Sequence, residues 1–353
     1  MKKSLNNKVI VLFILSSLGT GCRKDSPIPE SPVNNSDTTT IVCNTCPDFP
    51  PPGELGYGYV QNGIQYYKPC FNPNNENEFI YIRKTIPTVT ELVKYNLNTN
   101  TETIICDTEY IISQPQWGKL GIITFNTINK KVWTINEDGS NLIQLTFEGR
   151  DIFPNFNFSG DAIYYYRSKL YSNYDLEQNP DLYFESLMMK IDLNGNFIDS
   201  ITSYNIFLNT FYQNWSVSDF NNNAIYFKAG TAYNHGIYEM DENIETITPI
   251  FKWYEELNLL DLDFTNNKIY YTFWHNNLSV FDINTNTNNE FLEGCDTKYY
   301  DKISVSPNGN EMLVEKIINT PTVYEFGDVG IDEKHEIWLI NLTDKTETKI
   351  LGQ

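Results

Sequence analysis

One short pattern occurs six times along this chain and constrains the fold more than any other feature. In each copy a strand-like run of β-branched and aromatic residues ends in an Asn or Asp, and turn-forming residues follow. In the clearest copy, Lys131 to Ser140, the turn contains Asp138-Gly139, a step typical of a tight β-hairpin. Successive copies lie about 40 to 60 residues apart, which is the spacing of a β-propeller repeat. The residues that end the six runs are Asn96, Asn136, Asp192, Asp241, Asp282 and Asn341.

Each repeat holds enough strand-forming sequence for a four-stranded sheet. Such a sheet exposes two apolar faces when alone, and stacking around an axis covers both. We therefore predict an all-β fold: a six-bladed β-propeller of four-stranded antiparallel blades. The first strand of the second blade, at Gln116-Trp117-Gly118, is the weakest copy. The expected blades lie near residues 66–106, 112–147, 150–204, 208–251, 257–292 and 298–351.

The composition supports this interpretation and limits the partners. Tyr (24) and Phe (21) are abundant, as strands require. The formal net charge is −20, and removal of residues 1–21 would delete three Lys and no acid, which gives −23. Such a surface repels nucleic acid and anionic membranes. We expect no nucleic-acid partner and a monomer.

The first residues have the features of a targeting segment. A basic start precedes an apolar run, Val9 to Leu15, that is too short to span a bilayer. Ser16 to Cys22 resembles the lipobox of bacterial lipoproteins, which implies cleavage before Cys22 and acylation, palmitate included, of that residue. Arg23-Lys24-Asp25 resembles the surface-export signal of Bacteroidota lipoproteins. The alternative is an ordinary signal peptide with an incidental Cys.

These features divide the sequence into three parts. Residues 1–21 are expected to be a lipoprotein signal peptide. Residues 22–56 are rich in Pro, Ser, Thr and Asn and read as a disordered, lipid-anchored tether. Residues 57–353 are expected to form the propeller. Attachment to the outer membrane would then occur through acyl groups alone, with the body facing either the periplasm or the cell surface.

The remaining cysteines suit an oxidising compartment. Five cysteines follow Cys22, so at least one has no partner within the same molecule. We interpret Cys43-x-x-Cys46 as part of a structural clip between the N-terminal strap and the first blade. No second pair at metal-ligand spacing follows it, so a zinc site is not indicated. The candidates for disulfide formation are Cys43, Cys46, Cys70 and Cys106, with the connectivity open.

A family resemblance follows from two of these segments. Val132 to Thr146 is similar to the repeat of the TolB-type, WD-repeat-like propeller, and Asp151 to Asp161 is similar to its next blade entry. The resemblance implies a six-bladed propeller used for protein or ligand binding in the envelope. TolB carries an additional N-terminal α/β domain, whereas only a short strap is expected before the blades here.

Catalytic motifs are not recognisable in the sequence. Gly-x-Ser-x-Gly and His-Glu-x-x-His do not occur, and the three His residues are His235, His275 and His335. We predict no catalytic residue and no metal site. Asp192 to Asp199 has oxygen ligands at alternate positions, as a calcium loop would, but a hairpin turn is the better interpretation because the bidentate Glu is missing.

Candidate binding residues lie where the repeat is interrupted. Trp274 and His275 could line a sugar-binding patch, although packing between blades is the commoner role of such residues. An insertion at Ser168 to Phe184 and another at Ile317 to Lys334 are expected to form loops that carry recognition. The aromatic candidates of the first insertion are Tyr171, Tyr174 and Tyr183.

Three functions remain open on this sequence. The favoured one is a non-enzymatic envelope scaffold that binds a protein or peptide. The second is capture of a glycan at the cell surface. The third is a lyase or hydrolase with acids in the central channel.

Overall fold

The structure is a computed structural model, and it shows an all-β propeller with four-stranded antiparallel blades. All described residues belong to the compact unit Cys43–Gln353. Among them, no helix is long and apolar enough to cross a membrane. The structure describes residues 59–85, 89–107, 111, 113–157, 159–168, 186–201, 216–218, 224–231, 234–241, 247–253, 257–263, 265–273, 277–295, 297–323 and 329–352.

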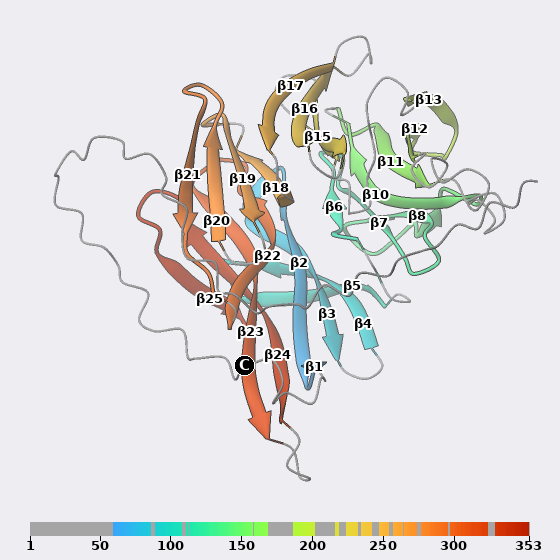
Figure 1. The fold of residues 1–353 in the computed structure, drawn as a ribbon. Helices are drawn as coiled ribbons and strands as arrows, with labels where there is room; N and C mark the ends of the chain where they lie inside the picture. The colour runs from blue at the N-terminus through green and yellow to red at the C-terminus, as the bar shows by residue number, and fades with distance from the viewer. Residues whose placement is uncertain are drawn as a thin grey trace, which may run out of the picture. The chain divides into compact units, whose positions relative to one another are not determined.

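Five four-stranded sheets follow one another along the sequence, each with its strands in sequence order (Figure 1). Blade 1 contains β2 (Ile64–Asn72), β3 (Asn75–Thr85), β4 (Val89–Asn96) and β5 (Thr101–Asp107). Blade 2 contains β6 (Gln116–Trp117), β7 (Ile122–Asn126), β8 (Val132–Asn136) and β9 (Ile143–Gln144). Blade 3 contains β10 (Arg150–Phe156), β11 (Ala162–Ser168), β12 (Ser186–Asp192) and β13 (Phe197–Ile201).

The remaining sheets complete the described fold. Blade 4 contains β14 (Ser216–Ser218), β15 (Ala224–Thr231), β16 (Asn234–Asp241) and β17 (Ile247–Trp253). Blade 5 contains β18 (Leu257–Asp263), β19 (Lys268–Phe273), β20 (Asn277–Asp282) and β21 (Thr287–Leu292). The last sheet, called sheet six below, contains β22 (Lys298–Val305), β23 (Glu311–Val323), β24 (Val329–Asn341), β25 (Glu347–Leu351) and β1 (Tyr59–Val60).

The Asn or Asp that ends each repeated run is the last residue of the third strand of its sheet. This holds for β4, β8, β12, β16, β20 and β24, as the sequence predicts. In blades 2 and 3 a Gly of the following turn, Gly139 or Gly195, has a φ of +85° or +83°. A Cβ at either position would lie 2.6 Å from the carbonyl oxygen of the preceding blade, at Ile105 or Leu145. The repeat therefore needs glycine both for its turn and for close packing of neighbouring blades.

The prediction of four strands in every blade holds for five sheets and is wrong for sheet six, which has five. Strand β25 pairs with β24 only from Ile337 to Ile340, and this leaves the earlier part of the long β24 without that neighbour. The N-terminal strand β1 pairs there in parallel, with Tyr59 opposite Ile331 (Figure 1). An exposed strand edge favours such addition, because its backbone groups need partners.

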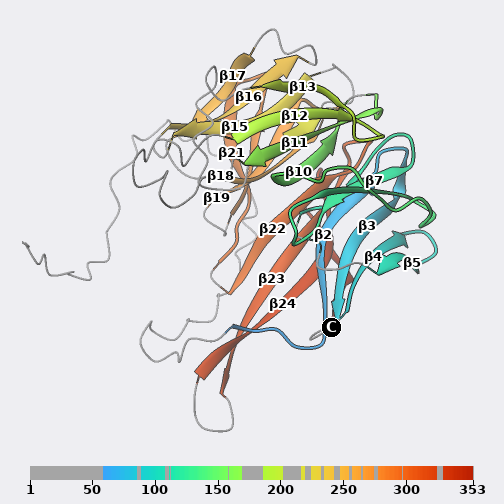
Figure 2. The same cartoon turned by 90° about the vertical axis from the view of Figure 1, so that its right-hand side faces the viewer.

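The predicted loop insertion at residues 317–334 is also wrong for its described part. Residues Ile317 to Val323 continue β23, and residues Val329 to Lys334 continue β24, in an unbroken antiparallel register. This hairpin extends past the end of β22, whose pairing with β23 stops at Ile318 (Figure 2). The β-branched residues of this segment explain why it stays in a strand despite Pro321.

Apolar clusters fill the space between neighbouring sheets. Between blades 1 and 2, Ile82 and Leu92 pack with Trp117 and Phe125. Similar clusters lie between blades 2 and 3, between blade 5 and sheet six, and between sheet six and blade 1. Stacking of this kind covers faces that no single sheet could bury alone.

The first strands of blade 1, blade 3 and sheet six share an irregularity that positions the site described below. Each has a β-bulge in its pairing with the second strand; the bulges of blades 1 and 3 lie at the same step, and that of sheet six lies one residue further along the second strand. Lys68 and Phe153, in two of these bulges, have a φ of 54°, a left-handed conformation that is uncommon for side chains of this size. Bulges redirect side chains and are frequent next to binding sites. The bulges contain Lys68-Pro69, Phe153-Pro154 and Asp301-Lys302.

Candidate functional site

A pocket of about 180 Å³ lies between blade 1 and sheet six. Strands β2, β3 and β4 contribute one side, and β22, β23 and β24 contribute the other. Its charged lining residues are Lys68, Lys84, Asp301, Glu315 and His335. Charged residues of both signs are thus concentrated where the two ends of the described chain meet.

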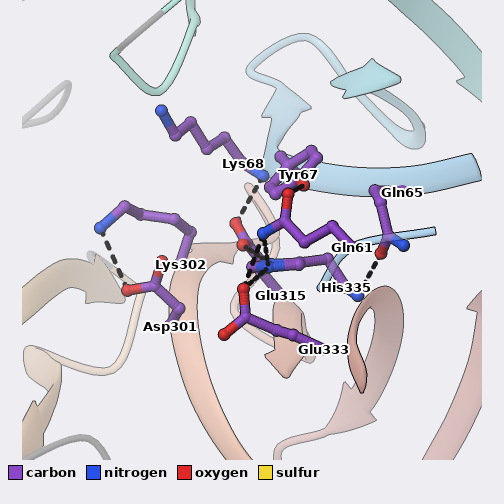
Figure 3. A network of polar contacts seen from close by, with 9 residues as sticks. All are labelled: Gln61, Gln65, Tyr67, Lys68, Asp301, Lys302, Glu315, Glu333 and His335. Atoms are coloured by element: carbon purple, nitrogen blue, oxygen red, sulfur yellow. Dashed lines mark hydrogen bonds and ion pairs between the residues drawn. The ribbon is translucent and has the colours of Figure 1, made fainter. Parts of the chain in front are cut away.

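Glu315 is at the centre of the polar contacts around the pocket (Figure 3). Its side chain is almost fully buried, at 1% exposure. One carboxylate oxygen accepts a hydrogen bond from the backbone N–H of Lys68 at 2.8 Å, and the other contacts Nδ1 of His335 at 2.7 Å. A carboxylate is buried without large cost only when it is paired and hydrogen-bonded, as Glu315 is.

His335 is held at both ring nitrogens. Nδ1 contacts Glu315, and Nε2 contacts Oε1 of Glu333 at 3.0 Å. Burial alone would lower the pKa of His335, but the hydrogen bonds to the two carboxylates outweigh burial and raise it to about 9. The hydrogen bond from His335 also lowers the pKa of Glu333. The imidazole is therefore charged at neutral pH and serves as a cation between two acids.

The N-terminal segment completes this network. Gln61 donates to Glu333 at 2.7 Å and accepts from the hydroxyl of Tyr67 at 3.1 Å. The side-chain oxygen of the buried Gln65 accepts from the backbone N–H of His335 at 2.7 Å. The ring of Tyr67 packs on the imidazole, with the centroids 4.3 Å apart. These contacts join residues from opposite ends of the described chain.

A third element fixes the same junction from blade 2. Gln114 donates from Nε2 to the carbonyl of Pro69 at 2.7 Å and to the carbonyl of Ile303 at 3.0 Å. It therefore ties the bulge of β2 to the end of the bulge of β22. The backbone that carries Lys68 is held on both sides and has little freedom.

The side chain of Lys68 has a lowered pKa. Burial and the neighbouring charge of Lys302 lower its pKa to about 8, although Glu315 and Asp301 act in the opposite direction. Lys84 adds a further positive charge close by. Asp301 forms an ion pair with Lys302 at 3.3 Å.

Most of the residues predicted as site candidates lie outside the described part of the protein. The exceptions are Cys70 and Cys106, which are free thiols and do not form a disulfide. Both pack at the apolar cluster between blades 1 and 2. They lie on the first and last strands of blade 1, which are about 14 Å apart at the usual strand spacing. This separation is too large for a disulfide. The candidates outside the described residues are Cys22, Cys43, Cys46, Tyr171, Tyr174, Tyr183, Trp274 and His275.

The cysteine that the structure does show in a disulfide was not among the candidates. Cys295, which precedes sheet six, is disulfide-bonded. Burial raises the pKa of Cys70 to about 12 and that of Cys106 to about 11, so both thiols are unreactive at neutral pH.

The turn at Asp192 is a hairpin between β12 and β13, as the favoured interpretation predicts. Its carboxylate accepts hydrogen bonds from the backbone N–H of Asn194 and Asn196 and from the Asn196 side chain. Calcium binding there stays a prediction, which a rise in melting temperature on adding calcium would support. Across the described residues, no group of three or more His, Cys, Asp or Glu is arranged to hold a metal ion.

Comparison with known proteins identifies the fold. TolB from Acinetobacter baumannii superposes with a TM-score of 0.54 at 15% identity, over 82% of this chain and 63% of that one. An acylaminoacyl peptidase from Pyrococcus horikoshii gives 0.51 at 13% identity, over 81% and 52%. A protein from a nidogen/laminin complex gives 0.50 at 8% identity, over 81% and 91%.

These similarities show a TolB-like propeller fold, as the sequence resemblance implies. The chain spans less than two thirds of the TolB structure and about half of the peptidase. No family model matches the sequence, and no curated protein is similar to it in sequence.

Proposed function

We propose that this protein is a non-enzymatic binding protein of the cell envelope, and that its propeller recognises a protein or peptide at the pocket between blade 1 and sheet six. We count sheet six as the sixth blade, closed by β1. The observation that carries the proposal is the geometry at His335. Its ring nitrogens contact the carboxylates of Glu315 and Glu333 at 2.7 and 3.0 Å. Neither nitrogen is therefore open to take a proton from a bound molecule, as a general base must.

The size of the pocket limits how much of a partner can enter it. Pockets for whole small-molecule ligands usually measure about 300–1,000 Å³. The volume here, about 180 Å³, suits a single side chain or a terminal residue of a partner. A longer partner would continue over the surface beyond it.

Location in the envelope is part of the same proposal. The lipobox ending at Cys22 and the Pro-rich segment of residues 22–56 would tether the propeller to the outer membrane. Incorporation of a palmitate analogue in wild type, and its loss in Cys22→Ser, would support this. Equal labelling of the two proteins would refute it.

The function itself is tested by crosslinking in cells. We expect a specific envelope protein to co-purify with wild type and with Lys268→Met, a control that removes a lysine on blade 5 that does not line the pocket. The same protein should be depleted with Lys68→Met. Recovery of abundant background proteins alone would contradict the proposal.

A further inference from the structure

We infer that a basic and apolar patch on blades 2 and 3 docks on an anionic lipid surface. The patch consists of residues 127–131, in the turn between β7 and β8, and residues 147–150, which lead into β10. None of these residues lines the pocket described above. The inference goes beyond the proposed binding function, but it rests on the location in the envelope that is part of that proposal.

Two large apolar side chains of the patch are exposed to solvent. Phe147 is 74% exposed, the highest value for a large hydrophobic side chain among the described residues, and Ile128 is 55% exposed. Hydrogen bonds hold the two segments side by side. The side chain of Lys131 donates to the carbonyl of Gly149 at 2.6 Å, and the backbone N–H of residue 151 donates to the carbonyl of residue 130 at 2.8 Å. Exposed apolar groups of this kind are typical of surfaces that meet an apolar phase.

Positive charge surrounds these apolar side chains. Within the described part of the chain, the side chains of Lys130 and Arg150 form no ion pair and no hydrogen bond. Burial lowers the pKa of Lys130, and the nearby charge of Arg150 lowers it further. The patch contains three cations and one acid, Glu148, while the adjoining pair of Arg167 and Asp151 is neutral. The phosphate groups of anionic lipids would supply the missing negative charge.

The charge of the whole protein does not prevent this contact. The formal net charge of −20 repels an anionic membrane at long range. Exposed charges are screened beyond about 8 Å at physiological ionic strength, so the patch decides the interaction once it reaches the surface. An acidic protein segment would match the cations alone. Phe147 and Ile128 beside those cations favour a lipid surface, which presents phosphate and acyl groups together.

The patch lies at the end of the propeller that carries β1. Thr127 forms a β-bridge with Ile111, which lines the pocket between blade 1 and sheet six. Gln61, directly after β1, lies 3.2 Å from the ring of His335 at the same pocket. The predicted tether, residues 22–56, ends just before β1. A flexible chain of about 35 residues spans roughly 30–36 Å, so an anchored propeller would keep the patch at a high effective concentration near the lipid.

Docking would add a second contact to the attachment through acyl groups. One acyl chain alone binds a membrane reversibly, and a basic patch is one of the signals that make attachment stable. The sequence-based expectation that acyl groups alone attach the protein would then be incomplete.

The test holds the full mature chain on vesicles without relying on acylation. An N-terminal His tag binds nickel-chelating lipid in vesicles of phosphatidylcholine, with or without phosphatidylglycerol. A polarity-sensitive thiol dye reports from Phe147→Cys. Wild type treated with the same dye gives the background from the native cysteines.

A matched reporter site lies on the opposite end of the propeller. Phe197 is 61% exposed and is the first residue of β13. It follows the turn between the third and fourth strands of its blade, whereas the patch contains the turn between the second and third strands. Dye at Phe197→Cys therefore reports a surface that points away from the docked lipid.

Two double variants test the charges at equal net charge. Lys130→Gln with Arg150→Gln removes two cations of the patch. Lys94→Gln with Lys268→Gln removes two cations on blades 1 and 5. Thermal melts of each variant show that the propeller is folded.

On anionic vesicles we expect the dye at residue 147 to enter an apolar environment and the dye at residue 197 to remain in water. Each patch cation should contribute about fivefold to the ratio of docked to undocked protein, so the patch double variant should lower it on the order of 30-fold. The control double variant should retain the response, and neutral vesicles should give none.

Three results would overturn the inference: equal responses at the two dye sites, an unchanged response in the patch double variant, or equal responses on neutral and anionic vesicles. A response at residue 147 to a soluble Glu-rich peptide, without a response to vesicles, would assign the patch to an acidic protein segment and would also overturn it.

This inference and the proposed function fail separately. If crosslinking recovers a specific partner and the dye does not respond to anionic vesicles, the lipid contact is wrong while the binding function stands. If the dye responds as expected and no partner is recovered in cells, the lipid contact stands and the proposed function is wrong.

Discussion

Two junctions of this propeller are built on the same hydrogen bond and differ in charge. Between blades 2 and 3, the side chain of Asn126 accepts from the backbone N–H of Phe153. Between sheet six and blade 1, the side chain of Glu315 accepts from the backbone N–H of Lys68. Asn126 and Glu315 also occupy equivalent positions, since each pairs with the fourth residue before the end of its third strand.

This difference shows which features of a junction the propeller fold needs. A neutral amide and an apolar bulge residue are sufficient at the junction of blades 2 and 3. At the other junction the buried carboxylate of Glu315 needs a cationic partner. His335 is that partner, and it contacts Glu333 in turn. Buried ion pairs are weak evidence for stability, so the charges at the second junction are consistent with the proposed binding function.

The largest effect is expected when the two acceptors are removed. Glu315→Ala leaves the charged His335 and the N–H of Lys68 without this partner, and should lower the free energy of unfolding by about 3–5 kcal/mol. Asn126→Ala leaves one N–H unsatisfied and should cost about 1–3 kcal/mol. Urea unfolding of the two variants measures both values. Equal losses would show that the charge at Glu315 is not important.

The state of His335 predicts a pH dependence. Its pKa is about 9 in the folded protein and about 6.5 when unfolded. Its contribution to stability is therefore complete below about pH 6.5 and is lost as the pH rises through about 9. At 1.36 kcal/mol per unit, the total is on the order of 3 kcal/mol.

Lys68 and Lys316, which lies on β23, act in the opposite direction. Burial lowers the pKa of each to about 8, so both favour folding as the pH rises. The measurement is therefore the difference in unfolding free energy between wild type and His335→Gln from pH 6 to 10. That difference should shrink with rising pH. A constant difference would mean that folding does not raise the pKa of His335.

A smaller effect is expected at the N-terminal contact. Gln61→Ala removes hydrogen bonds to Glu333 and Tyr67 from a part-buried position, and should cost about 1 kcal/mol. A loss as large as that of Glu315→Ala would mean that the N-terminal segment, rather than the carboxylate, holds the junction together. Urea unfolding under the same conditions provides the comparison.

The architecture was predictable because its signal is local. A strand, an Asn or Asp and a Gly turn lie within ten residues of one another, and each predicted end residue, such as Asn136, ends a third strand. The extension of β23 and β24 was misread as a loop, since Asn319-Thr320-Pro321 has the composition of a turn. The pairing of β24 with β1 joins two segments that are far apart in the sequence, so no local sequence pattern predicts it.

The pocket could not be predicted because its parts are distant in sequence. Lys68 and His335 lie at opposite ends of the described chain and meet only when sheet six packs on blade 1. One signal was available. Glu315 interrupts the apolar run Met312-Leu313-Val314 at a position where blade 1 has Ile82. A buried acid in place of an aliphatic residue indicates a special site, but its partners are visible only in the fold.

The exchange of one junction residue for its counterpart tests the central claim most directly. Lys68→Phe gives blade 1 the bulge residue of blade 3 and keeps the backbone N–H that Glu315 accepts. The unfolding free energy should stay within about 1 kcal/mol of wild type, while the recovery of the crosslinked partner falls at least about tenfold. A stability loss comparable to that of Glu315→Ala, with unchanged recovery of the partner, would show that Lys68 serves the fold and would contradict this account.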